Sequence, residues 1–195
     1  MDSHTAPMPV LTAINERRSV RAYKPERVPR DTLLELMRAA VRAPTAIHEE
    51  QWAFAVIQGR ERLKQLSEET RAPFAAAVGT DLHAPGLHFH ATTPDFNLFY
   101  DADTLILICT QPMGPFVAAD CWLAAENLML AAHAMGLGTC VIGSASVGLN
   151  QPEIKAQLGL AAEIQVIVPL IVGWPADAGA PTARRAPEVL SWIAD

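Results

Sequence analysis

The sequence has few cysteines and no excess of positive charge, and each shortage excludes a class of protein. Three cysteines occur among 195 residues, and Cys109, Cys121 and Cys140 all lie in apolar stretches. An odd number of cysteines in such surroundings predicts reduced core thiols rather than a disulfide framework. Lys and Arg number 15 against 21 Asp and Glu, which gives a formal net charge of −6. This balance argues against nucleic acid as the main partner, because phosphate backbones are bound by basic surfaces.

The chain also shows no targeting segment, internal linker or repeat. Its first residues, MDSHT, carry neither the basic segment nor the apolar core of a signal peptide, and with reduced cysteines this predicts a cytoplasmic protein. A length of 195 residues without a linker predicts one domain over 1–195. Hydrophobic residues make up 50% and charged residues 18% of the chain, which is typical of a globular protein with a full core.

The longest apolar stretch, 117–135, is interrupted only by Asp120, Glu126, Asn127 and His133. Apolar residues recur along it at helical spacing, which predicts a long helix that a glycine terminates. The residues expected to face inward are Ala118, Trp122, Ala125, Met129 and Ala132, flanked by Cys121, Leu128 and Met135. The carboxylates and the abundance of Ala argue against a membrane span. A helix that is apolar nearly all round must be covered on several sides, by its own domain or by a partner chain.

Residues 136–143 read Gly-Leu-Gly-Thr-Cys-Val-Ile-Gly and predict a tight turn into a strand. A dinucleotide-binding fingerprint needs a strand before its glycines and a helix after them. Here the order is reversed and the third glycine comes late, so this stretch is not a Rossmann turn.

Apolar periodicity elsewhere alternates between helical and strand patterns. It predicts helices at 10–16, 30–42, 61–77, 152–158 and 189–193, with an interruption near Pro73. It predicts strands at 53–57, 104–109, 141–142 and 164–174. In the helix at 30–42 the residues expected to face inward are Leu33, Leu34, Met37, Ala40 and Val41. Strands separated by helices indicate one central sheet with helices packed around it.

A basic cluster after the first predicted helix is the strongest local signal for a ligand. Arg17, Ser19 and Arg21 are spaced to lie on one side of a helix end or extended segment, with Arg18 beside them. A guanidinium donates parallel, charge-assisted hydrogen bonds to a phosphate, each contributing roughly 1.5–3 kcal/mol. The cluster is therefore a candidate phosphate site, and the alternative is a solvated helix end that neutralises nearby carboxylates.

The cluster also belongs to an ordered set of motifs that resembles the FMN-dependent nitroreductase family. The set begins with Arg-Arg-Ser-Val-Arg at 17–21 and continues with the turn at 43–46, the strand start at 52–54 and Phe99-Tyr100 before an apolar strand. It ends with Ala-Ala-Glu-Asn-Leu at 124–128, Gly-Leu-Gly-Thr at 136–139, Gly-x-Pro at 173–175 and Arg184-Arg185. Each motif has low specificity alone, but together they follow the family's order over nearly the whole chain.

The resemblance implies an α+β, nitroreductase-like fold, in which helices surround a central mixed or antiparallel sheet and a C-terminal extension reaches the partner subunit. It implies a homodimer with FMN at the interface. The implied activity is that of a flavin oxidoreductase that takes hydride from NADH or NADPH and then reduces a small organic acceptor, such as a nitro compound or quinone, in a ping-pong reaction. In such enzymes the flavin carries the chemistry, which agrees with the lack of a convincing nucleophile, triad or carboxylate dyad in the sequence.

The resemblance also assigns flavin contacts to the arginines. Arg17 and Ser19, with Arg18 beside them, would meet the phosphate and ribityl chain. Arg185 would return from the tail to the phosphate. Arg21 would approach the N1 and O2 atoms at the pyrimidine edge, where positive charge favours the anionic reduced flavin.

Two further stretches are implied to contact the flavin ring. The backbone at Val141, Ile142 and Gly143 would lie against the isoalloxazine, and Thr45 with its turn would face the flavin from the partner chain. In this turn His48 stands where relatives usually have an Asn that contacts the flavin. A histidine there could donate a hydrogen bond and would titrate near neutral pH.

Acidic residues depart from the family pattern at two places. Glu50 replaces a Gln, and a carboxylate facing the ring would oppose the anionic reduced flavin. The alternative is that Glu49 and Glu50 turn outward to water, because unpaired buried carboxylates are costly. Asp103 stands where relatives often have Pro. These departures leave FMN as the expected cofactor and count against an ordinary nitroaromatic substrate.

Three histidines, His83, His88 and His90, fall in an irregular segment. No Cys or carboxylate set has matching spacing, so a surface loop is favoured over a metal site and no metal is expected. In the family this region is variable and covers the flavin, which makes 83–97 the candidate for substrate contacts.

Two other functions fit the same residues. A flavin-binding or flavin-handling protein with little nicotinamide-driven turnover would follow if the turn at 48–50 altered the site. A phosphate binder without flavin would follow from the arginine cluster alone. The expected partners are a second copy of this chain and a small molecule, and neither nucleic acid nor a membrane.

Overall fold

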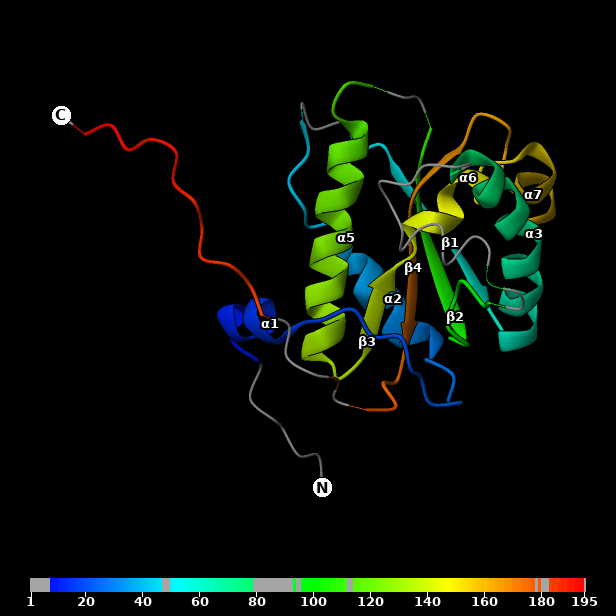
Figure 1. Ribbon diagram of the computed structural model, residues 1–195, viewed down its shortest axis with the longest axis horizontal. Coiled ribbons are helices and arrows are strands. Elements are labelled where there is room, and N and C mark those ends of the chain that lie inside the picture. The colour runs from blue at the N-terminus through cyan, green and yellow to red at the C-terminus, as the bar shows by residue number, and fades with distance from the viewer. Residues whose placement is uncertain are drawn as a thin grey trace.

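A four-stranded sheet organises the chain in the computed structural model, which describes residues 8–46, 50–78, 93, 96–111, 114–177, 179 and 183–194. The strands are β1 (Trp52–Gln58), β2 (Thr104–Thr110), β3 (Gly138–Val141) and β4 (Gln165–Gly173). Their order is β1-β2-β4-β3, and each neighbouring pair is antiparallel (Figure 1). β2 lies between β1 and β4, and all its residues are buried, as its apolar run predicts.

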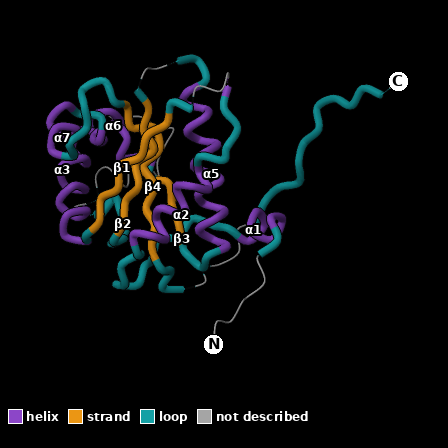
Figure 2. Tube along the Cα trace, turned by 180° about the vertical axis from the view of Figure 1, so that it is seen from behind, coloured by secondary structure: helices purple, strands orange, loops and turns teal. Residues whose placement is uncertain are grey.

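Helices cover both faces of this sheet (Figures 1 and 2). One face is covered by α2 (Arg30–Ala40) and α5 (Val117–Ala134), and α1 (Val10–Glu16) packs on α5 from outside. The other face is covered by α3 (Arg60–Val78), α6 (Ser146–Leu149) and α7 (Pro152–Gln157). A short 3-10 turn, η2 (Gly143–Ala145), leads from the end of β3 into α6.

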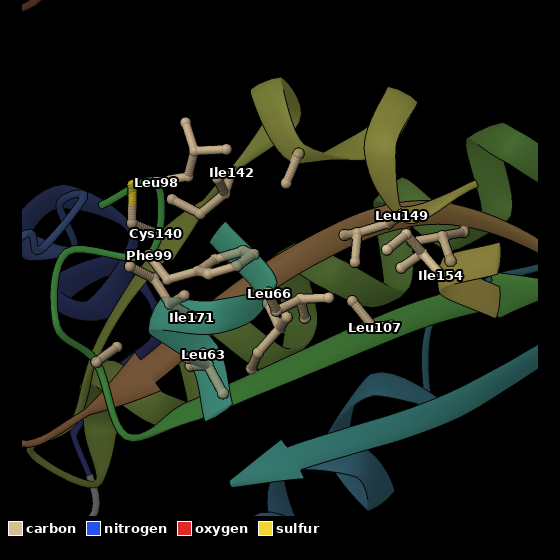
Figure 3. Close-up of a cluster of buried hydrophobic side chains, with 14 of the residues drawn as sticks. Leu63, Leu66, Leu98, Phe99, Leu107, Cys140, Ile142, Leu149, Ile154 and Ile171 are labelled. Atoms are coloured by element: carbon tan, nitrogen blue, oxygen red, sulfur yellow. The ribbon is translucent and has the colours of Figure 1, made fainter. Parts of the chain in front are cut away.

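The alternation of side chains along β2 divides the core into two layers. Ile106 packs with α2 and α5, whereas Leu105 and Leu107 pack with α3 and α6. Figure 3 shows the second layer, in which Leu63 and Leu66 of α3 lie beside Leu107. The α+β class with helices around an antiparallel sheet is thus confirmed, as are the predicted strands and the helices up to residue 158, with small shifts at their ends.

The predicted inward face of α5 is confirmed in large part, with a clear exception at Trp122. The predicted stripe placed Trp122 inward, but its side chain is 48% exposed, and the neighbouring Leu123 is 46% exposed. The other predicted positions agree with the structure: Ala125, Met129 and Ala132 are buried, as are the flanking Cys121 and Leu128, and the unpredicted Ala124 is buried with them. A helix that is apolar nearly all round has little asymmetry from which the inward face could be predicted. Part of α5 is therefore uncovered by its own subunit. Among the described helices, none combines the length and hydropathy that a membrane span requires.

Two smaller predictions about helices are also wrong. α3 is not interrupted at Pro73, because proline removes only one helical hydrogen bond and the buried Thr70 packs this part of α3 closely against α6. α2 ends at Ala40, so Val41 lies beyond it and is 38% exposed, whereas the unpredicted Leu36 is fully buried.

The C-terminal tail leaves the body of the subunit. Residues 183–194 are exposed and extended, and they run past α1 away from the sheet (Figure 1). The helix predicted at 189–193 is absent, and Leu190 and Trp192 are 90% and 85% exposed. An isolated turn of helix is marginal in water, and the described part of the chain leaves the apolar side chains of this stretch exposed.

Candidate functional site

The basic cluster lies on an extended segment, residues 17–23, that runs beside β3 and the end of β4. The amide of Val20 donates to the carbonyl of Thr139 (2.9 Å), and the amide of Lys24 donates to the carbonyl of Trp174 (2.8 Å). These bonds hold the segment at its middle and just after its last residue. Because alternate side chains of an extended chain point to opposite sides, its odd-numbered residues share one side.

Two glycines allow this segment to lie so close to the sheet. A Cβ added to Gly138 would be 2.7 Å from Val20, and one added to Gly173 would be 2.7 Å from the ring of Tyr23. Such distances are far below ordinary carbon contacts. The hydroxyl of Tyr23 donates to the carbonyl of Val20 at 2.7 Å, which stabilises the conformation of residues 20–23. Gly138 and Gly173 therefore allow the segment that carries the arginines to pack against the sheet.

The positive charges of Arg17 and Arg21 and the hydroxyl of Ser19 all influence the Cys140 thiol of β3. Burial raises the pKa of the Cys140 thiol, and Arg21, a side-chain hydrogen bond with Ser19, and Arg17 oppose this effect in that order. The thiol itself donates to the carbonyl of Val141 at 3.6 Å. Two cations and a hydroxyl are thereby gathered at one edge of the sheet, which is the donor set that a phosphorylated ligand requires.

A hollow of about 380 Å³ is lined by Arg17, Arg18 and Val20, and a second hollow of about 250 Å³ lies beside Arg21. The second one opens where β3 ends and η2 begins. Its lining residues are Arg21, Phe96, Leu98, Tyr100, Cys140, Val141, Ile142, Gly143 and Ser144. A Cβ added to Gly143 would meet nothing within 4 Å, so the backbone is accessible on this side. An aromatic ring could approach it there.

An ion pair orients Arg17 between α1 and α5. Its Nε lies 3.4 Å from Oε1 of Glu126, and the two side chains are 20% and 45% exposed. This contact involves the Nε atom rather than the two terminal nitrogens of the guanidinium. The two terminal nitrogens stay available for a further acceptor of negative charge.

Comparison with known proteins identifies the family. The nitroreductase family profile matches residues 14–174. The chain belongs to the nitroreductase family. It is 27% identical over 188 residues to an FMN reductase [NAD(P)H] of Bacillus subtilis, covering 93% of this chain and 72% of that protein. It is also 25% identical over 168 residues to an iodotyrosine deiodinase of Thermotoga neapolitana, covering 83% and 86%.

A solved structure confirms the nitroreductase fold. A nitroreductase with bound FMN from Bacteroides fragilis superposes with a TM-score of 0.80 at 28% identity, covering 95% of this chain and 98% of that chain. The resemblance inferred from the ordered sequence motifs is therefore confirmed for both family and fold.

Within this nitroreductase fold, four of the predicted contacts meet at one hollow. Arg21, Val141, Ile142 and Gly143 all line the hollow at the end of β3. Ser19 pairs with Thr139, the residue before Cys140 of this hollow, whereas Arg17 lines the larger hollow.

Arg18 donates hydrogen bonds to two backbone carbonyls. Its Nε donates to the carbonyl of Glu16 (3.2 Å) and its Nη1 to the carbonyl of Gly179 (3.4 Å). It lines the larger hollow together with His133 and Asp177. Arg18 thus shares this hollow with Arg17 and lies apart from Arg21, and its side chain contacts the start of the tail at Gly179.

The turn with Thr45 follows α2 and is held by α5. The amide of Ala46 donates to both carboxylate oxygens of Asp120, at 3.2 and 3.3 Å. Thr45 is half-buried, and Glu50 is exposed in a left-handed conformation (φ 46°). In this subunit Glu50 therefore faces water. His48 lies outside the described residues.

The remaining sequence candidates lie apart from the hollow. Arg185 is exposed on the extended tail. Asp103 is buried and its Oδ2 lies 3.3 Å from Nε of Arg27, so it has a structural partner. The three histidines at 83–90 lie outside the described residues, as does most of the predicted substrate segment. Within the described ranges, no group of three or more His, Cys, Asp or Glu is placed to hold a metal.

Sequence reasoning missed the aromatic wall of the hollow. Phe96 and Tyr100 contact each other edge to face, with ring centroids 5.5 Å apart. Phe99-Tyr100 was part of the family motif, but the sequence could not show which ring enters the core. Phe99 is fully buried, whereas Tyr100 is half-buried and faces Arg21.

Proposed function

We propose that this chain is an FMN-dependent oxidoreductase that uses NADH or NADPH to reduce a small organic acceptor. The observation that carries the proposal is the extended segment with Arg17, Ser19 and Arg21, which runs beside Thr139 of β3 and brings Arg21 to the hollow where β3 ends. Arg17 supplies a cation for a phosphate, Ser19 supplies a hydroxyl for a polyol chain, and the backbone near Gly143 is accessible to a flat ring. This order of chemical groups is the order found in FMN.

The proposed contacts follow from this alignment. Arg17 would donate to the flavin phosphate from its terminal nitrogens, since its Nε pairs with Glu126. Ser19 would bind the ribityl chain, and Arg21 would place positive charge at the pyrimidine edge. Arg18 would add to the positive field and hold the tail through Gly179.

The backbone of Val141, Ile142 and Gly143 would lie along one face of the ring. The hollow is open there, since Gly143 has no side chain and nothing lies within 4 Å of where its Cβ would be. Bound FMN would supply two half-reactions at this single position, hydride from the nicotinamide and then reduction of the acceptor, in a ping-pong sequence. The chain would position both substrates and supply charge.

A second copy of the chain would complete the site. The outer surfaces of α1 and α5 expose Val10, Leu11, Ile14 and Trp122, which are 64%, 69%, 50% and 48% exposed. Such an apolar surface fits a dimer interface better than contact with water. We propose a homodimer in which Thr45 and His48 face the partner's flavin and the tail carries Arg185 to the partner's phosphate.

The family and one relative support the proposed classes of acceptor. The family supports a nitro compound or a quinone, and the deiodinase relative supports a halogenated phenol as a third class to test. The three free, buried cysteines support a location in the reducing cytoplasm.

The proposal is tested by FMN titration of the purified chain, followed through quenching of flavin fluorescence. Arg17→Gln removes one or two charge-assisted hydrogen bonds, each contributing roughly 1.5–3 kcal/mol, so the affinity for FMN should fall at least tenfold. Arg38→Gln changes an exposed arginine on the outer side of α2 and serves as the matched control.

Three outcomes separate the functions. Wild-type affinity in Arg38→Gln and a loss in Arg17→Gln support the proposed site. No binding of FMN by the wild-type chain refutes it and leaves the phosphate binder. FMN binding without oxidation of NADH or NADPH in the presence of nitroaromatic, quinone and iodotyrosine acceptors supports the flavin-handling alternative.

A further inference from the structure

The turn that carries Tyr100 has a strained backbone. Tyr100 and Asp101 are consecutive non-glycine residues with φ angles of 50° and 54°. Side chains rarely occupy this left-handed region, and two in succession persist only where the surroundings impose them. Strain of this kind clusters at functional sites.

Neighbouring side chains impose the strained turn. The Asn97 Oδ1 accepts from the amide of Phe99 (2.9 Å), and its Nδ2 donates to Oδ1 of Asp101 (2.8 Å). The amide of Leu98 donates to the hydroxyl of the buried Ser67 (2.8 Å). Leu98 and Phe99 are 1% and 0% exposed and anchor the turn in the core (Figure 3). Because the consecutive residues Leu98 and Phe99 both point into the core, the backbone turns sharply at Tyr100 and directs its side chain outward.

The reversal directs the Tyr100 ring toward Arg21. The Cζ atom of Arg21 lies over this ring, 5.7 Å from its centroid. Phe96 contacts the same ring edge to face, with ring centroids 5.5 Å apart. A guanidinium held over an aromatic face keeps the N–H groups of its own plane free to donate elsewhere. Both residues line the hollow that ends at Gly143.

We propose that Tyr100 is a positioning residue for Arg21: the strained turn presents an aromatic face that holds the guanidinium at the flavin's pyrimidine edge and thereby raises the reduction potential of the bound cofactor. This inference rests on the proposed function. Without the ring, the flexible Arg21 side chain, which is otherwise exposed, would spread over many rotamers and its charge would be shared with water.

The test compares the midpoint potential of FMN bound to the full-length wild-type protein and to Tyr100→Leu and Tyr100→Phe, using reference dyes under anaerobic conditions. Tyr100→Leu should bind reduced FMN about tenfold less well relative to oxidised FMN, a drop of about 30 mV for a two-electron couple. Tyr100→Phe keeps the aromatic face and should retain most of the wild-type potential. If the leucine variant does not fold, Tyr100→Asn replaces it, because Asn enters the left-handed region more readily.

A second background shows whether the effect passes through Arg21. The double variant Arg21→Gln, Tyr100→Leu should have the same midpoint potential as Arg21→Gln alone, because the cation that Tyr100 positions is absent from both. An unchanged potential in Tyr100→Leu, or the same drop with and without Arg21, overturns the inference. If wild-type protein binds no FMN the proposed function fails, whereas normal FMN binding with an insensitive potential rejects only the role of Tyr100.

Discussion

The close approach of the basic segment to β3 gives a sharp prediction for Gly138→Ala. The new Cβ would lie 2.7 to 2.8 Å from three atoms of Val20. Carbon atoms pack best at roughly 3.5–4.0 Å, so the segment must move away by roughly 1 Å. Overpacking of this kind costs about 1–3 kcal/mol of unfolding free energy. Because Arg17, Ser19 and Arg21 lie on the same segment, FMN affinity should fall together with stability.

Urea unfolding and FMN titration measure the two effects separately. Gly143→Ala is the stability control, because its Cβ would meet nothing within 4 Å, and its unfolding free energy should stay within about 0.5 kcal/mol of wild type. Adding Val20→Ala to Gly138→Ala removes two of the three contacting atoms and should recover about 1 kcal/mol relative to the sum of the single changes. Wild-type stability and affinity in Gly138→Ala would refute the claim that this glycine seats the arginines.

Three other predictions concern residues outside the hollow. In Gly148→Ala the Cβ would lie 2.5 Å from the Cα of Thr70, so thermal unfolding should show a loss of about 3 kcal/mol while the folded fraction binds FMN normally. Asp103→Asn breaks an ion pair whose partner, Arg27, is 62% exposed, and it should cost only about 1 kcal/mol in urea with no change in FMN affinity. Burial raises the pKa of Cys109 from 9.0 to about 12 and that of Cys121 to about 11, so between pH 9 and 11 the unfolded state loses protons that the folded state keeps. Stability should therefore fall as pH rises through this window, by about 1.4 kcal/mol per unit for each thiol, and flat urea midpoints would contradict it.

The elements were predictable where periodicity is strong. β2 and β4 are apolar runs with covered faces, and the end of α5 at a glycine follows from local backbone chemistry. The grouping of Arg17, Ser19 and Arg21 on one segment was predictable because the three residues are close neighbours in the sequence.

Tertiary structure decided what the sequence could not. The inward face of α5 depends on what packs around it, so the exposure of Trp122 was not predictable from an almost uniformly apolar helix. The direction of Arg18 is set by the carbonyl of Gly179, which is distant in sequence. The role of Tyr100 depends on backbone strain that Asn97 stabilises, and no periodic pattern records it.

The most direct test of the account is the visible absorption spectrum of the FMN-loaded protein before and after anaerobic addition of NADH and, separately, NADPH. The protein should show flavin bands of bound cofactor that bleach with at least one of the two nicotinamides and return when an acceptor is added. Bands that persist with both would contradict an oxidoreductase and direct attention to the turn at 45–50. A protein that retains no flavin at all would contradict the proposed site.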